Sequence, residues 1–160
     1  MEKRLRVYVD TSVFGGVFDR EFSRASEEFF TLARIGKFIL ISSGIVEDEL
    51  KESPQKVRSF FDSLSTFIET ADLTPEAIKL QTGYIEAGIV SEKWLADAAH
   101  VAIATVSECS MIVSWNFKHL VNFKKVQLYN AVNILKGYST LSIISPPEVI
   151  GYYEENEKEI

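Results

Sequence analysis

The chain has 160 residues, a net charge of −6 at pH 7, 46% hydrophobic residues and 25% charged residues. This profile excludes a disordered chain, and the acidic balance argues against a broadly basic nucleic-acid-binding surface. A nucleic-acid substrate is still compatible with it, because acids gathered around divalent cations change sign locally once the cations bind. The only cysteine is Cys109, which excludes an internal disulfide and agrees with a reducing compartment.

The N-terminal segment lacks the long apolar core of a signal peptide, and no apolar run approaches membrane-spanning length. We therefore expect a soluble, cytoplasmic protein that has no membrane partner. The length fits one domain. We place that domain at residues 1–150, followed by a solvated acidic tail at 151–160 that is prone to fraying.

The first half of the chain alternates predicted strands and helices. Residues 5–9 are rich in strand formers and alternate in polarity, so a strand should end at Asp10, with Thr11 and Ser12 opening a turn. The other elements expected here are a helix over 23–35, a buried strand over 37–41, and helices over 42–52 and 54–64.

The second half continues this alternation. Its expected elements are a strand over 67–69, helices over 74–88 and 91–108, a strand over 111–114, a helix over 130–136 and a strand over 141–144. Short strands that alternate with helices predict an α/β fold, a three-layer sandwich with a central parallel sheet flanked by helices. In open sheets of this kind, ligands bind outside the carboxyl ends of the strands.

Asp97 opens the most informative segment, residues 97–104, which as a helix is apolar almost all the way round and therefore buried. An ionised carboxylate is costly to bury unless it is paired or bound to a metal ion. The alternative is a carboxylate at a helix start that bonds to backbone N–H groups. One turn on, His100 could be a ligand, a substrate contact or an orienting group, although a satisfied core histidine is the favoured interpretation.

Two more acids, Asp10 and Glu49, lie in similarly apolar settings. Asp10 follows a buried strand, with a turn residue or helix cap as the alternative. On a helical wheel Glu49 falls between Ile45 and Val46, whereas Glu47 lies outside the apolar arc, so Glu49 is the acid turned inward. The alternative for Glu49 is a partly exposed side chain at the edge of the core.

Polar residues around the fourth predicted strand complete the candidate site. Asn116 could ligate a hard cation or hold a water on it, or else cap the turn formed by residues 117–119. Ser114 could hydrogen-bond an inward carboxylate or simply end its strand. We expect Thr11, Ser114 and His119 to contact substrate, with a surface position as the alternative for His119.

Oxygen-rich ligands suit Mg²⁺ or Mn²⁺ rather than zinc, and the sequence has no Cys/His cluster. It also lacks a phosphate-binding loop, a dinucleotide-binding fingerprint and a nucleophile elbow. Carboxylates that hold hard cations are typical of sites for phosphodiester hydrolysis. The Trp115 ring could stack on a base of a nucleic-acid substrate. A phospho-acceptor or phosphatase domain with Asp10 as nucleophile is less favoured. Such a domain is expected to have an Asp-x-Asp motif that begins at Asp10, and Ser12 stands where the second aspartate of that motif would be.

Four segments, in this order, resemble the PIN domain and, within it, the VapC-type toxin ribonucleases of toxin–antitoxin pairs. Residues 7–12 resemble the family's opening strand and acid, and residues 42–50 its Glu-Leu helix. Residues 97–104 are similar to its central Asp-Ala helix, and residues 112–116 stand where it often has a strand followed by Thr-x-Asp. The resemblance covers nearly the whole chain.

The resemblance implies a PIN-like, Rossmann-like sheet, a Mg²⁺ or Mn²⁺ site, and endonucleolytic cleavage of RNA by the toxin of a toxin–antitoxin pair. It also implies a homodimer and an antitoxin that blocks the site. Asp10, Glu49 and Asp97 would be the metal-site acids, joined in catalysis by Asn116. Asn116 stands where the family often has a fourth acid, so this chain has one negative charge fewer at the site, which should weaken metal binding. The alternative is therefore a catalytically weakened PIN scaffold that binds RNA or protein.

Overall fold

The computed structural model describes residues 3–158 and contains a sheet of five parallel strands in the order β3-β2-β1-β4-β5. The strands are β1 (Arg6–Val9), β2 (Ile39–Ser43), β3 (Ile68–Ala71), β4 (Met111–Val113) and β5 (Ser142–Ile144). The predicted parallel sheet is therefore confirmed.

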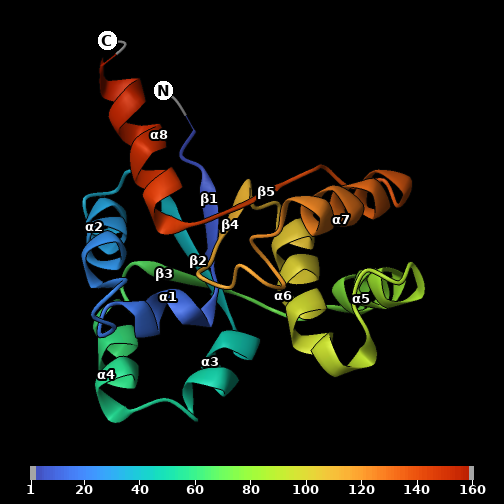
Figure 1. Ribbon diagram of the computed structural model, residues 1–160, viewed down its shortest axis with the longest axis horizontal. Coiled ribbons are helices and arrows are strands. Elements are labelled where there is room, and N and C mark those ends of the chain that lie inside the picture. The colour runs from blue at the N-terminus through green and yellow to red at the C-terminus, as the bar shows by residue number, and fades with distance from the viewer. Residues whose placement is uncertain (1–2, 159–160) are drawn as a thin grey trace.

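Helices cover both faces of the sheet, which confirms the three-layer architecture (Figure 1). One side carries α1 (Thr11–Gly16), α2 (Ser23–Arg34), α4 (Gln55–Ser63) and α8 (Pro146–Lys158). The other carries α5 (Pro75–Glu86), α6 (Leu95–Val106) and α7 (Phe123–Leu135), and a 3-10 turn, Glu92–Trp94, precedes α6. The short helix α3 (Gly44–Leu50) follows β2 at the carboxyl end of the sheet.

The centre of the core is formed by β1 and α6. Val7, Tyr8 and Val9 have no exposed surface, because β1 lies between β2 and β4 and is covered on both faces. In α6, every residue from 98 to 105 is buried, as the apolar pattern predicted. Asp97 lies at the open end of this buried run and is only partly covered. The buried residues of β1 and α6 lead directly to Asp10 at the end of β1 and to Asp97 near the start of α6.

Side-chain caps account for three of the predicted boundaries that the structure corrects. Thr11 and Ser12 begin helix α1 rather than a turn, because the Asp10 side chain accepts a hydrogen bond from the Ser12 amide and caps the helix. Ser43 ends β2 and caps α3 through its side chain, which accepts from the Val46 amide. Helix α7 begins at residue 123 instead of 130, because the Asn122 side chain caps it.

Helix α8 starts at Pro146, where proline suits the first helical position, and Glu148 Oε1 accepts hydrogen bonds from both Ser145 N and Ser145 Oγ. The helix runs past residue 150, the expected end of the domain, and the Tyr153 ring packs against Phe38 at 5.7 Å between centroids. The single-domain organisation stays a prediction. Within the described residues, no helix combines the length and apolarity needed to cross a membrane.

Candidate active site

Side chains from three distant segments meet at the carboxyl edge of the sheet. Asp10 directly follows β1, Glu49 lies on α3, and His100 lies on α6. One potential ligand atom from each of these three residues lies within 4.8 Å of the other two. We call these three residues the acid–histidine cluster.

Two serine hydroxyls orient the buried carboxylate of Asp10, which is 6% exposed. Its Oδ2 accepts hydrogen bonds from Ser12 Oγ at 2.7 Å and from Ser114 Oγ at 2.8 Å. Ser12 Oγ in turn accepts from the Trp115 amide at 2.9 Å, which ties the start of α1 to the end of β4. Because both serine hydroxyls bind Oδ2, Oδ1 is the oxygen that faces His100 Nε2, at 3.6 Å.

Glu49 reaches the cluster from a more exposed position, since its side chain is 40% exposed. Its Oε1 accepts a hydrogen bond from Thr11 Oγ1 at 3.2 Å and lies 2.5 Å from His100 Nε2. Glu49 is therefore the inward-facing acid of α3, as helical spacing predicted, whereas Glu47 is exposed.

His100 is 1% exposed, and both of its ring nitrogens have partners. Nδ1 lies 2.6 Å from the Tyr8 hydroxyl, which lies 2.7 Å from Ser43 Oγ. Burial lowers the pKa of His100, but the hydrogen bond to Glu49 and the charges of the nearby carboxylates outweigh it, so the net pKa is raised. Burial has the opposite effect on Tyr8 and raises its pKa, which keeps the hydroxyl neutral.

Asp97 lies outside the acid–histidine cluster but within its electrostatic reach. Burial raises its pKa, and repulsion from the Asp10 carboxylate adds to the effect. Among residues 3–158, no hydrogen bond or ion pair to the Asp97 carboxylate is formed. This acid is therefore the least compensated of the three predicted ones.

The other predicted residues lie around the cluster in different roles. Ser114 and Thr11 bind the carboxylates of Asp10 and Glu49 directly. Asn116 caps its own turn, because its Oδ1 accepts from the His119 backbone N–H at 3.0 Å while its own backbone N–H donates to Ser114 Oγ.

His119 is buried, with 9% exposure, and packs on the Trp94 ring at 4.0 Å between centroids. The Trp115 ring stacks on Phe22 at 4.2 Å, and its Nε1 donates to Ser26 Oγ, so one face of the indole is already covered. Substrate contact by His119 stays a prediction.

The acid–histidine cluster fits a divalent cation. Ions such as Mg²⁺ hold oxygen ligands at about 2.0–2.6 Å, so ligand atoms that lie within 4.8 Å of one another can share one ion. Two carboxylates and Asp97 concentrate negative charge in a partly buried space, and a cation offsets the mutual repulsion of the acids. The geometry is therefore compatible with one divalent cation at the acid–histidine cluster, with the Asp97 carboxylate nearby.

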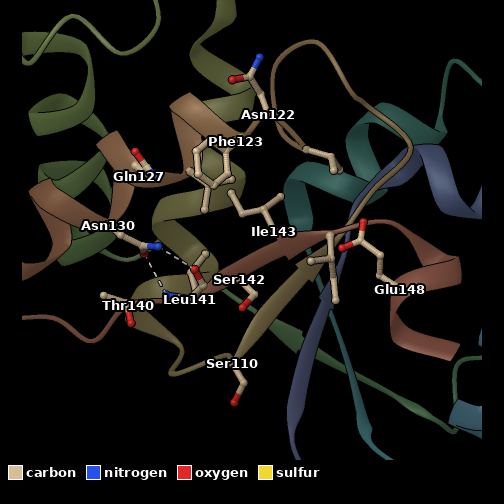
Figure 2. Close-up of a pocket in the computed structure, with 13 residues that line it drawn as sticks. Ser110, Asn122, Phe123, Gln127, Asn130, Thr140, Leu141, Ser142, Ile143 and Glu148 are labelled. Atoms are coloured by element: carbon tan, nitrogen blue, oxygen red, sulfur yellow. Dashed lines mark hydrogen bonds between the residues drawn. The ribbon is translucent and has the colours of Figure 1, made fainter. Parts of the chain in front are cut away.

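A hollow of about 620 Å³ lies elsewhere, between β5 and the first half of α7 (Figure 2). The Asn130 amide bonds to both backbone groups of Leu141, which satisfies the chain just before the edge strand. Its one acid, Glu148, is already engaged at the start of α8. This hollow therefore offers no cluster of reactive groups.

The sequence left the supporting residues of the cluster largely unidentified. His100 is buried with both ring nitrogens partnered, as the favoured interpretation of a satisfied core histidine predicts, and its Nε2 also faces two carboxylates. Its position one turn after Asp97 was the available signal. Tyr8 and Ser12 gave none, since an aromatic residue in a strand and a serine in a turn are common without any link to a site.

No protein-family model matches the sequence, and no curated protein matches it. Among solved structures, the chain is similar to VapBC2 from Rickettsia felis bound to a DNA fragment from its promoter, with a TM-score of 0.58 and 14% identity over 88% of this chain and 98% of that one. It is also similar to VapC20 from Mycobacterium tuberculosis, a sarcin–ricin loop cleaving toxin, with a TM-score of 0.52 and 14% identity over 71% and 92% of the two chains. The chain therefore has the PIN fold of these VapC structures, as the sequence resemblance led us to expect.

Proposed function

We propose that the protein is a divalent-metal-dependent endoribonuclease, the toxin of a toxin–antitoxin pair, which hydrolyses RNA phosphodiester bonds. The observation that carries this proposal is the convergence of Asp10, Glu49 and His100 at the carboxyl edge of the sheet, with Asp97 beside them. The shared fold supports it, because one structural neighbour is a toxin that cleaves the sarcin–ricin loop.

Asp10 and Glu49 would hold the ion, Mg²⁺ or Mn²⁺, and Asp97 would contact it directly or through water. A divalent cation bound there would polarise the phosphodiester and favour ionisation of the attacking water. The serine hydroxyls on Asp10 Oδ2 keep its other oxygen turned toward the cluster. A carboxylate beside the ion would take up the proton of the attacking water, and Asp97 lies near enough to the cluster to have this role where it is not itself bound to the ion.

Asn116 has a supporting part in this scheme. Its side-chain oxygen accepts a hydrogen bond within the turn that follows β4. Its backbone N–H donates to Ser114 Oγ, and Ser114 Oγ in turn donates to Asp10. We propose Thr11, Ser114 and His119 as the residues nearest to the bound RNA.

The cleavage experiment combines the purified protein with an unstructured RNA oligonucleotide and, separately, with a sarcin–ricin loop RNA. Reactions contain Mg²⁺, Mn²⁺ or EDTA. We expect cleavage with metal and none with EDTA. Glu49→Gln should abolish cleavage, whereas Glu47→Gln, on the same helix but exposed, should leave it intact. Equal cleavage by both variants, or cleavage in EDTA, would contradict the proposal.

A thermal melt tests the metal site without any RNA. A ligand that binds only the native state stabilises it by about 2.7 kcal/mol at a concentration one hundred times its Kd. We expect Mn²⁺ at millimolar concentration to raise the Tm of the wild type and to leave that of Glu49→Gln nearly unchanged. A wild-type Tm insensitive to millimolar Mn²⁺ would remove the metal from the proposal.

The second candidate function is a catalytically weakened scaffold that binds RNA or protein. The observation that favours it is Asn116, which occupies a position where the resembled family has an acid and whose oxygen is committed to a backbone amide. Comparing wild type with Asp97→Asn separates the two functions. Metal-dependent cleavage that is lost in the variant supports the enzyme, whereas equal background in both supports the binding module.

We further propose a cytoplasmic homodimer whose active site is blocked by a small antitoxin protein. The supporting observation is the fold likeness to the VapBC2 assembly from Rickettsia felis. Co-expression with the product of the adjacent reading frame, followed by purification and measurement of mass and cleavage, tests this assignment. We expect a complex of the two proteins with suppressed activity.

A further inference from the structure

The least expected member of the acid–histidine cluster is a nitrogen ligand rather than an oxygen. His100 is 1% exposed, so the ring has no alternative position in solvent, and its Nε2 edge faces Glu49 Oε1 at 2.5 Å and Asp10 Oδ1 at 3.6 Å. Its other edge is fixed by Tyr8 at 2.6 Å. The ring is thus held from behind and directed at the place where the two carboxylates meet.

We propose that His100 Nε2 is a third protein ligand of the metal ion and that this nitrogen makes the site prefer Mn²⁺ to Mg²⁺. The inference rests on the proposed function for the presence of an ion. Mg²⁺ is a hard cation that takes oxygen ligands almost exclusively, whereas an imidazole suits first-row transition metals. Two carboxylates with one imidazole therefore form a donor set closer to the needs of Mn²⁺.

The hydrogen-bond chain behind His100 can support either state of the site. With Ser43 donating to Tyr8 and Tyr8 donating to Nδ1, the proton of the neutral ring lies on Nε2 and is donated to Glu49. With Nδ1 donating to Tyr8 and Tyr8 donating to Ser43, Nε2 presents a lone pair toward the carboxylates. Only two hydroxyl groups and one ring proton change between these arrangements, and in the second one Nε2 has a partner only when the ion is bound.

Ser43 can serve both arrangements because it also accepts from the Val46 amide at 3.3 Å and still has capacity to donate or accept. A metal-bound histidine normally donates its second ring N–H to an oxygen, which fixes the tautomer and the ring plane. Tyr8 is positioned to be that oxygen. A structural core histidine also needs one partner at each ring nitrogen, so the feature that points to a ligand is the second carboxylate, Asp10 Oδ1, at 3.6 Å from the same Nε2.

The chain has only two histidines, His100 and His119, which makes the nitrogen assignable by pulsed electron paramagnetic resonance of bound Mn²⁺. The protein is prepared without a histidine tag, and Mn²⁺ is titrated until the free-ion signal appears. We expect ¹⁴N imidazole modulation in the wild type, the same modulation in His119→Gln, and none in His100→Gln. We also expect His100→Gln to weaken Mn²⁺ binding by about 10- to 100-fold while Mg²⁺ binding changes much less.

The outcomes separate this inference from the proposed function. Bound Mn²⁺ without imidazole modulation in the wild type overturns the nitrogen ligand and leaves a metal-dependent nuclease intact. Absence of Mn²⁺ binding overturns both. If His100→Gln does not fold, the wild type and His119→Gln still decide the matter, because modulation retained after loss of His119 can come from His100 alone. Equal losses of Mn²⁺ and Mg²⁺ affinity in His100→Gln would contradict the metal preference.

Discussion

Helix α6 carries two buried polar networks, one near each end, and they differ in how their groups are satisfied. Near its C-terminus, Tyr84 donates to Asn133 Oδ1, and Asn133 Nδ2 donates to Thr105 Oγ1 at 3.0 Å. Every group in this network is neutral, since burial raises the pKa of Tyr84. Near its N-terminus, His100 faces the carboxylates of Asp10 and Glu49.

The difference shows how a structural network is distinguished from a candidate site in one fold. The neutral network satisfies itself with hydrogen bonds and needs nothing from solution, so its role is to fix α5, α6 and α7 relative to one another. The charged network brings like charges together and leaves the pKa of Asp97 raised by burial and by repulsion from Asp10, so the network gains from an added cation. Substitutions in the neutral network should therefore lower stability without changing metal binding, whereas substitutions in the charged network should mainly lower activity.

The largest expected effect is on activity, at Asp10. Asp10→Asn should lower metal-dependent cleavage by at least about 100-fold, because substitution of residues that merely support metal ligands already costs about 10- to 100-fold. Single-turnover cleavage rates with Mn²⁺ measure this loss, and Asp62→Asn, at an exposed position on α4, is the control. A reduction of less than tenfold would show that Asp10 is not part of the reaction centre.

The next effect is on stability, in the neutral network. Tyr84→Phe leaves the Asn133 oxygen without its donor and should cost about 1–3 kcal/mol of unfolding free energy. Denaturant unfolding measures this cost, and Mn²⁺ binding should not change.

Tyr129→Phe is the matched control for Tyr84→Phe. Tyr129 is fully buried beside Tyr84, yet its hydroxyl has no hydrogen-bond partner within the described part of the chain. Its removal should be neutral or stabilising. Equal losses in the two variants would mean that the hydrogen bond itself contributes nothing.

The smallest expected effect is a gain of stability at Asp97 in the absence of metal. The folded-state pKa of Asp97 is raised, so the native protein binds more protons than the unfolded chain and loses stability as the pH rises through this window. Asp97→Asn removes that loss. Because the group is partly exposed, we expect a gain below about 1 kcal/mol at neutral pH.

Thermal melts in EDTA over a pH series test the Asp97 prediction. The advantage of the variant should grow from about pH 4 upward and level off above the raised pKa. In Mn²⁺ the order should reverse, because the wild type gains more from the ion. A variant less stable than the wild type at neutral pH in EDTA would show that the carboxylate has a stabilising structural role.

Much of the fold could be predicted from local pattern. The apolar strands at 5–9 and 111–114 and the apolar helix after Asp97 are encoded by residues close together in the chain, and the structure confirms them. The missed starts of α1 and α7 have one common reason. In both, the side chain of the preceding residue caps the helix: Asp10 accepts from the Ser12 amide, and Asn122 accepts from the Lys125 amide. A single Asp or Asn that caps a helix has the same local sequence signal as one in a turn.

The sequence by itself determined the α/β class, the parallel sheet and the edge at which polar side chains would gather, because hydrophobic periodicity is a local property. It also identified Asp10 and Glu49 as inward-facing acids. Only the tertiary structure decided that His100 joins them while Asp97 stands beside them, and that Asn116 caps a turn. The position of His100 depends on contacts between residues far apart in the chain, such as Tyr8 and His100, which are 92 positions apart, and side-chain periodicity along a chain carries no information about such contacts.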